Sequence, residues 1–276
     1  ADAEYALNGA YSATRRIFSR DYMFDGLGDF LRFRSSASAS QTTGDRAIAY
    51  RGGTYNNPSA SYGSSFDNYF QYSYAAINHI NYVIENVERM LPNAANETST
   101  ANLKAIIGEA RMLRGMVYFR LITLWGDVPY FDKVIESNDE VEHITRTSVT
   151  EIKESILEDF TFAWENCHNT PAKLGRFTKW GALAFRGKMQ LYWASWNRTS
   201  WPWETPVAEN GGWPELDTFT PSESESVTAY AAAASDLRRV IEESGLELFR
   251  NGEPGEIGGL GISGRAICRH LARQRV

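Results

Sequence analysis

The sequence has 276 residues, 43% hydrophobic and 22% charged, with a formal net charge of -6. These values are typical of a folded globular chain and exclude a fibrous or intrinsically disordered one. A negative net charge is unfavourable for phosphate-rich partners, so we expect no binding to nucleic acid.

The two cysteines, Cys167 and Cys268, are too few for a disulfide framework and lack metal-ligand spacing. No apolar run approaches the roughly 18 residues that a spanning helix needs. The first residues carry neither the charged nor the apolar part of an export signal, so any such signal is expected to have been removed or never to have existed. We therefore expect two free thiols and no membrane-spanning helix.

The N-terminal half begins with a helical pattern that is interrupted and then resumes. Two stripes at helical spacing predict a first helix with a wide buried face: Ala6, Ala10, Ala13 and Ile17, and beside them Leu7, Tyr11, Thr14 and Phe18. Residues 34–69 are rich in Ser, Gly, Thr and Asn and predict a long loop with scattered aromatic residues. Helical spacing then runs from Phe70 to Leu91, and Pro92 ends this second helix.

Two further helices carry clear end signals. A third helix is predicted over residues 103–124, ended by Gly126. Ser148 and Glu151 match a capping box at the start of a fourth helix. The apolar register of this helix reaches Cys167, so we expect this cysteine in the core.

The last two predicted helices flank a tryptophan-rich segment. Thr178 can cap a fifth helix, in which Gly187 costs about 1 kcal/mol relative to Ala and would be justified by close helix packing. The segment from residue 196 to 213 is rich in Trp. A sixth helix is then predicted from the periodic positions Val227, Tyr230, Ala234, Leu237 and Ile241, with Gly245 closing it.

Helices of this length, recurring in pairs, predict an all-α fold: tetratricopeptide-like helical hairpins stacked in a superhelix with long irregular loops. The sequence contains no clean 34-residue repeat. We assign residues 1–250 to one helical domain. Residues 251–276 differ in kind, because they lack aromatic residues and are rich in Gly and Arg; we expect this tail to be foreign, out of frame or poorly ordered.

Three segments resemble the SusD-like (RagB/SusD) family. They are Tyr5-Ala-Leu-Asn-Gly-Ala-Tyr-Ser-Ala, then Gly108-Glu-Ala-Arg-Met-Leu-Arg-Gly-Met-Val-Tyr-Phe-Arg-Leu with Trp125-Gly-Asp-Val-Pro-Tyr, and Arg176-Phe-Thr-Lys-Trp-Gly-Ala-Leu-Ala-Phe-Arg-Gly-Lys-Met-Gln-Leu-Tyr. The resemblance covers residues 1–250, as the N-terminal portion of a generally longer family. We interpret Arg114, Arg120 and Asp127 within these segments as structural, with the two arginines flanking the core and Asp127 bonding to the backbone in a turn.

The resemblance implies a lipoprotein of the Bacteroidota, anchored at the cell surface in the outer membrane and active in polysaccharide utilization. Such a protein binds oligosaccharide nutrients without catalysis and delivers them to a SusC-like TonB-dependent transporter. No cofactor is implied. The lipid-bearing Cys of the family is absent here, so we expect that the sequence begins just after it and that the anchor is the sole contact with the membrane.

Aromatic loops with polar neighbours are suited to sugars, because the flat C–H faces of a sugar shed water against rings while its hydroxyls bond to polar edges. The candidate ligand-binding residues are Tyr50, Arg51, Tyr55, Asn56, Asn57 and Tyr62 in the first loop, and Trp201 and Trp203 in the second. Packing is an alternative role for each of them. A peptide ligand also stays open.

Two other functions are compatible with the pattern. An all-helical glycoside hydrolase also has aromatic loops, and a tetratricopeptide-like protein-interaction module also has paired helices. The four histidines lack zinc-binding spacing, and neither a Walker loop nor a G-x-S-x-G motif is present. We therefore expect no catalytic residue, no metal and no cofactor.

Overall fold

The computed structural model describes residues 2–18, 62–198 and 221–247. This part of the chain contains six α-helices: α1 (Asp2–Phe18), α4 (Tyr62–Met90), α5 (Glu97–Trp125), α6 (Val149–Asn166), α7 (Lys179–Arg198) and α8 (Glu223–Glu243). Two short 3-10 helices, Leu91–Asn93 and Asn138–Glu140, lie in connections. Within these residues, extended pairing is limited to one bridge between Val128 and Thr147, so the all-α prediction is confirmed.

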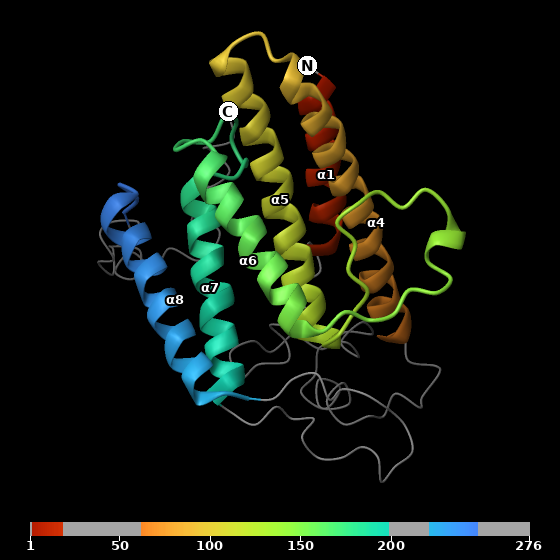
Figure 1. Cartoon of the computed structure of the whole chain (residues 1–276), viewed down its shortest axis with the longest axis vertical. Helices are drawn as coiled ribbons and strands as arrows, with labels where there is room; N and C mark the ends of the chain where they lie inside the picture. Colours follow the sequence, from red (N-terminus) through yellow and green to blue (C-terminus); the bar gives the residue numbers. More distant parts are fainter. Residues whose placement is uncertain (1, 19–61, 199–220, 248–276) are drawn as a thin grey trace, which may run out of the picture.

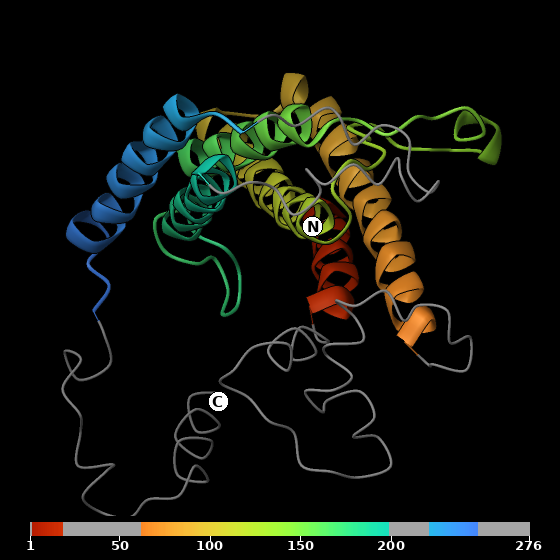
Figure 2. The same cartoon turned by 90° about the horizontal axis from the view of Figure 1, so that it is seen from below.

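Successive helices run in opposite directions and pack side by side (Figure 1). Helix α1 packs on both α4 and α5, and each later helix packs on the one before it. Seen from below, the helices form a curved array from α4 to α8 (Figure 2). The predicted architecture of stacked, tetratricopeptide-like hairpins is therefore confirmed.

Local signals set several helix ends where the sequence predicted them. Gly126 follows α5 with φ of 71°, a left-handed value that favours glycine. The Ser148 hydroxyl accepts a hydrogen bond from the backbone N–H of Glu151 at the start of α6. Cys167 follows α6 and is buried, as predicted.

Two predicted boundaries are wrong. Helix α4 begins at Tyr62, so residues 62–69 are helical although the sequence predicted a loop there. Tyr69 is 2% exposed and its carbonyl accepts a hydrogen bond from the Ser73 hydroxyl, so tertiary burial outweighs the weak local propensity. Helix α7 extends through Trp196, whose ring lies 4.7 Å from that of Tyr192.

The buried face of α8 differs from the stripe that predicted the helix. Val227 and Ile241 are 61% and 76% exposed. The fully buried positions are Ser226, Ala229, Ala233 and Asp236. The Ser226 hydroxyl donates to the carbonyl of Ala194, and partnered polar groups can be buried at little cost.

Glycines mark the closest helix contacts. A Cβ at Gly115 of α5 would lie 2.7 Å from Phe160 of α6, and one at Gly187 of α7 would lie 2.8 Å from Leu237 of α8. The expectation that close packing explains Gly187 is confirmed.

Buried ion pairs cross the helix interfaces. Arg114 of α5 makes two hydrogen bonds, 2.8 and 2.7 Å, to Asp159 of α6. Arg186 of α7 makes two of 2.7 Å to Asp236 of α8. The structural interpretation of Arg114 is thus confirmed.

The three segments that carry the family resemblance meet in one cluster. The Glu109 carboxylate of α5 accepts a 2.5 Å hydrogen bond from the Tyr11 hydroxyl of α1 and a 2.6 Å bond from Nε of Arg176. The Tyr11 hydroxyl in turn accepts from the backbone N–H of Phe177. These residues hold three distant parts of the chain together.

Residues 251–276 lie outside the described residues, so the predicted tail and its boundary at residue 250 stay predictions. Among the described helices, none combines the length and the apolarity that a membrane span requires.

Candidate functional site

Both predicted ligand-binding loops connect to the same end of the helical array. Helices α1 and α7 run toward the end at which α4 and α8 begin (Figure 1). Residues 19–61 lie between α1 and α4, and residues 199–220 lie between α7 and α8. We call this the loop-bearing end. The alternation of helix direction brings to it the helix ends that flank two segments far apart in the sequence.

Most of the candidate residues lie outside the described part of the chain. They are Tyr50, Arg51, Tyr55, Asn56, Asn57, Trp201 and Trp203. Tyr62, expected in the loop, is the first residue of α4. A role in ligand binding stays a prediction for all of them.

A chain of aromatic rings starts near the beginning of α4 and continues along it. The ring of Trp125, at the end of α5, lies 6.2 Å from that of Tyr69 and 5.2 Å from that of Phe70. Phe70 is 4.8 Å from Tyr74, and Tyr74 is 5.7 Å from Phe131. The described structure therefore places a chain of neighbouring rings, partly exposed except for the buried Tyr69, next to the loop-bearing end.

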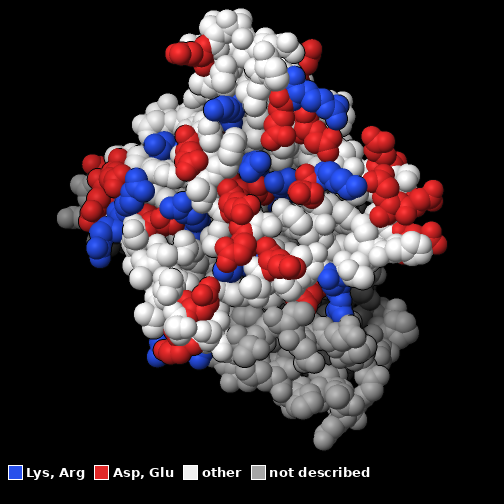
Figure 3. Space-filling model, in the orientation of Figure 1, with Lys and Arg blue, Asp and Glu red and all other residues white. Residues whose placement is uncertain are grey.

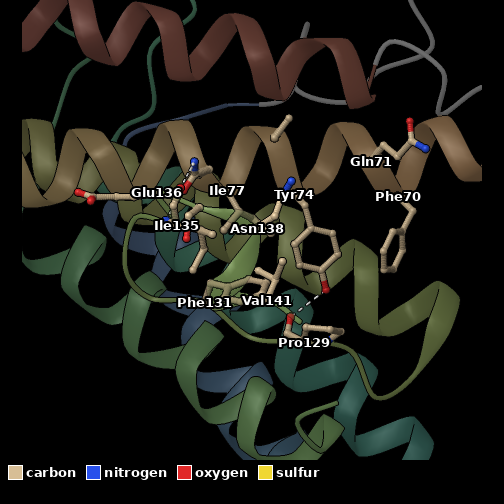
Figure 4. Close-up of a pocket in the computed structure, with 13 residues that line it drawn as sticks. Phe70, Gln71, Tyr74, Ile77, Pro129, Phe131, Ile135, Glu136, Asn138 and Val141 are labelled. Atoms are coloured by element: carbon tan, nitrogen blue, oxygen red, sulfur yellow. Dashed lines mark hydrogen bonds between the residues drawn. The ribbon is translucent and has the colours of Figure 1, made fainter. Parts of the chain in front are cut away.

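This aromatic chain leads into a groove between α4 and residues 129–141, with a volume of about 820 Å³ (Figure 4). We call it the α4 groove. Its lining residues are Phe70, Gln71, Tyr74, Ala75, Ile77, Asn78, Pro129, Phe131, Ile135, Glu136, Ser137, Asn138 and Val141.

Side chains of α4 hold the opposite wall of the groove in place. The Tyr74 hydroxyl donates a 2.8 Å hydrogen bond to the carbonyl of Pro129. The side-chain amide of Asn78 donates to the carbonyl of Ile135 at 3.1 Å and accepts from its N–H at 2.8 Å. Each of these bonds joins residues more than fifty positions apart in the sequence.

Asn81 connects this wall to the buried ion pair of α5. Its Nδ2 donates to the carbonyls of Phe131 and Lys133, at 3.1 and 2.8 Å, and its Oδ1 accepts from Arg114 at 2.9 Å. Asn81 is fully buried. The wall is therefore anchored to the core rather than held by groove residues alone.

Tyr74 presents an aromatic face rather than a titratable group. Burial raises the pKa of its hydroxyl, which stays protonated and donates to Pro129. The same cause raises the pKa of Tyr118, whose hydroxyl bonds to the backbone of Phe131. Neither group is suited to act as a base at neutral pH.

A second set of rings lies on α5 and α7. Tyr192 is 39% exposed, and its ring meets those of Phe119 at 5.5 Å and Trp196 at 4.7 Å in edge-to-face contacts. Trp196 also contacts the buried Trp193. These rings come before residues 199–220, so partly exposed aromatic surface precedes the second loop as well.

The sequence did not identify the α4 groove. Phe70 and Tyr74 follow each other at the four-residue spacing of one helix face, which is the signal that could have drawn attention to them. Their partner Phe131 lies beyond the next helix, and nothing local predicts that contact. Within the described residues, no group of three or more His, Cys, Asp or Glu side chains could hold a metal ion.

A family model for SusD-like proteins, described as starch-binding and associating with the outer membrane, matches residues 27–191. A SusD-like protein of Bacteroides ovatus is 31% identical over 183 residues, which are 65% of this chain and 28% of that protein.

Two solved structures share the fold over 90% of this chain. A SusD homolog from Bacteroides thetaiotaomicron superposes with a TM-score of 0.61 at 20% identity, covering 41% of that chain. A laminarin-binding SusD-like protein superposes with a TM-score of 0.60 at 19% identity, covering 46% of that chain. This chain therefore corresponds to less than half the length of each of these relatives.

Proposed function

Because the chain belongs to the SusD-like family, we propose that it binds oligosaccharides reversibly, without a catalytic step and without a cofactor. The family description names starch binding, and one solved relative is described as laminarin-binding. The all-α fold gives the proposal a rigid scaffold, from which loops can present rings to a ligand.

The proposal extends to the cellular setting. The family description names association with the outer membrane. We infer a lipid-anchored protein at the cell surface, which captures oligosaccharide and delivers it to a SusC-like TonB-dependent transporter. Reversible capture is suited to delivery because a ligand that is bound too tightly would not be released.

The observation that carries the proposal is that the helix ends flanking both candidate loops lie at the loop-bearing end. Tyr50 and Tyr55 belong to one loop and Trp201 and Trp203 to the other. Rings from two loops can stack on the faces of successive sugar units, and the neighbouring amide and guanidinium groups can bond to hydroxyls. The rings of Tyr192 and Trp196 near the end of α7 extend the apolar surface at the same end.

The experiment is a glycan-array screen with the full chain, followed by isothermal titration of the best ligand. Tyr50→Ala and Tyr55→Ala should each weaken binding at least about fivefold, in the range expected for the loss of one stacked ring, with an unchanged melting temperature. Tyr82→Ala is the matched control, because Tyr82 is 55% exposed on α4 and lies outside both loops.

The alternative functions give different results in the same assays. A glycoside hydrolase would release new reducing ends from the bound glycan over time. A protein-interaction module would leave the glycan array silent. A loss of folding in Tyr50→Ala or Tyr55→Ala would mark these rings as core rather than as ligand contacts.

A further inference from the structure

One wall of the α4 groove carries negative charge. On the α4 side, Glu85 is paired with Arg89 at 3.3 Å and Glu88 with Arg111 at 3.8 Å. The opposite wall continues into residues 136–142, which hold four carboxylates and neither Lys nor Arg. Acidic side chains gather where residues 136–142, which we call the lobe, project from the helices (Figure 3). The charge around the groove is complementary to a cation.

The carboxylates of the lobe are available at the surface. Glu136, Asp139 and Glu142 are exposed. The backbone N–H of Glu136 lowers the pKa of Glu140, so this side chain is ionised at neutral pH. Lys133, on the same wall, lies 3.7 Å from Glu140 and offsets part of this charge.

The floor of the groove is apolar, and the polar groups of Tyr74 and Asn78 on it are already engaged, whereas the exposed side chains of Gln71, Ser137 and Asn138 also line the groove. The rings of Phe70, Tyr74 and Phe131 lie along it. The Tyr74 hydroxyl is bonded to Pro129, and both polar atoms of the Asn78 amide are bonded to Ile135. A sugar needs edge groups that are free to bond its hydroxyls, so this floor is better suited to aliphatic or aromatic side chains.

We propose that the α4 groove is a second binding site, which takes an extended segment of a partner protein that carries apolar side chains interspersed with Lys or Arg. The apolar side chains enter the groove, and the long cationic side chains reach the carboxylates on its rim. This site is separate from the glycan site proposed at the loop-bearing end and does not depend on it.

The test uses a fluorescein-labelled octapeptide in which Lys alternates with Leu or Phe, measured by fluorescence anisotropy against the full chain. A counterpart with Glu in place of each Lys reports on the charge. We expect the Lys peptide to bind with micromolar affinity that weakens as salt is added, because salt screens exposed charges. We expect the Glu peptide to bind at least tenfold more weakly.

Ala75→Arg blocks the groove at an exposed helix position, and Ala101→Arg makes the same change at an exposed position of α5 outside the groove. Ala75→Arg should weaken binding of the Lys peptide at least tenfold, and Ala101→Arg should weaken it by less than twofold. Charge reversal with Glu136→Lys and Glu142→Lys together should also weaken it.

Three outcomes overturn the proposal: no binding of the Lys peptide, equal binding of both peptides, or equal effects of the two Arg substitutions. Loss of glycan binding in Ala75→Arg, with peptide binding unchanged, would assign the groove to sugar instead. Failure of the glycan proposal is recognised separately, because Tyr50→Ala and the glycan array test it without the groove.

Discussion

Glu109 of α5 and Arg176 ahead of α7 form a buried ion pair with bonds of 2.6 and 3.2 Å, and their side chains are 3% and 8% exposed. Removal of Arg176 leaves the Glu109 carboxylate buried without this counter-charge, with only the hydrogen bond from the Tyr11 hydroxyl retained in the cluster. Arg176→Ala should therefore destabilise the fold by about 3–5 kcal/mol, as measured by urea denaturation.

Lys173→Ala is the control for this prediction, since Lys173 pairs with Glu4 at the surface, with side chains 59% and 46% exposed. Its loss should cost at most about 1 kcal/mol. Equal costs for the two substitutions would contradict the structural role of the buried pair.

Gly115→Ala should destabilise the protein although alanine is the better helix former. The new Cβ would lie 2.7 Å from the ring of Phe160, which is fully buried, so the ring would have to shift against its core neighbours. Overpacking of this kind costs about 1–3 kcal/mol, more than the roughly 1 kcal/mol gained in helix propensity. Gly9→Ala is the control, since nothing lies within 4 Å of its Cβ, and it should raise the melting temperature.

Asn81→Asp should loosen the wall of the α4 groove. In the parent protein, the carbonyls of Phe131 and Lys133 accept hydrogen bonds from the Asn81 amide. The substitution replaces that donor with a carboxylate oxygen, which cannot donate to them. Because Lys133 is exposed, trypsin should cleave after it faster in this variant than in the parent.

Asn86→Asp is the control on the same helix, since its amide donates to the carbonyl of Tyr82 at the surface. Its cleavage rate after Lys133 should stay within about twofold of the parent, as expected for a surface change. Faster cleavage in both variants would point to a general loosening of α4 instead.

Cys167 should be inert toward iodoacetamide in the folded protein. Burial raises the pKa of its thiol to about 12, so the reactive thiolate is scarce at pH 8. In a Cys268→Ser background, Cys167 of the native protein should be alkylated at least about a hundredfold more slowly than in urea, as followed by mass spectrometry. Folding favours the protonated thiol, so its contribution to stability is complete below about pH 8.5 and is lost as the pH rises toward 12. Rapid native alkylation would contradict the burial.

Tyr55→Ala and Trp203→Ala should be coupled in glycan binding if the two loops form one site. Isothermal titration of the single and double variants should give a coupling free energy above about 0.5 kcal/mol, whereas separate sites add within about 0.3–0.5 kcal/mol. Additive effects on affinity would indicate that the two rings contact separate ligands or separate subsites.

The sequence predicted the helices because their signals are local. The end of α5 at Gly126 and the start of α6 after Ser148 follow from backbone conformation and capping within one turn. The burial of Cys167 followed from helical register. The resemblance of three segments to the family predicted the fold, but it did not predict the contact between Tyr11, Glu109 and Arg176.

Other features depended on partners that are distant in the chain. Ser226 and Asp236 are buried in α8, and Val227 and Ile241 are exposed, because Ala194 and Arg186 of α7 satisfy the polar groups across the interface. The first turns of α4 are helical although their composition predicted a loop.

What the sequence determined by itself is an array of amphipathic helices with two aromatic loops, because helical spacing and turn residues act over a few positions. The tertiary structure alone decided that the helix ends flanking both predicted loops lie at one end of the array and that α4 and residues 129–141 enclose a groove. The physical reason is that helix direction and long-range hydrogen bonds, such as that between Tyr74 and Pro129, are set by packing between segments that no local pattern connects.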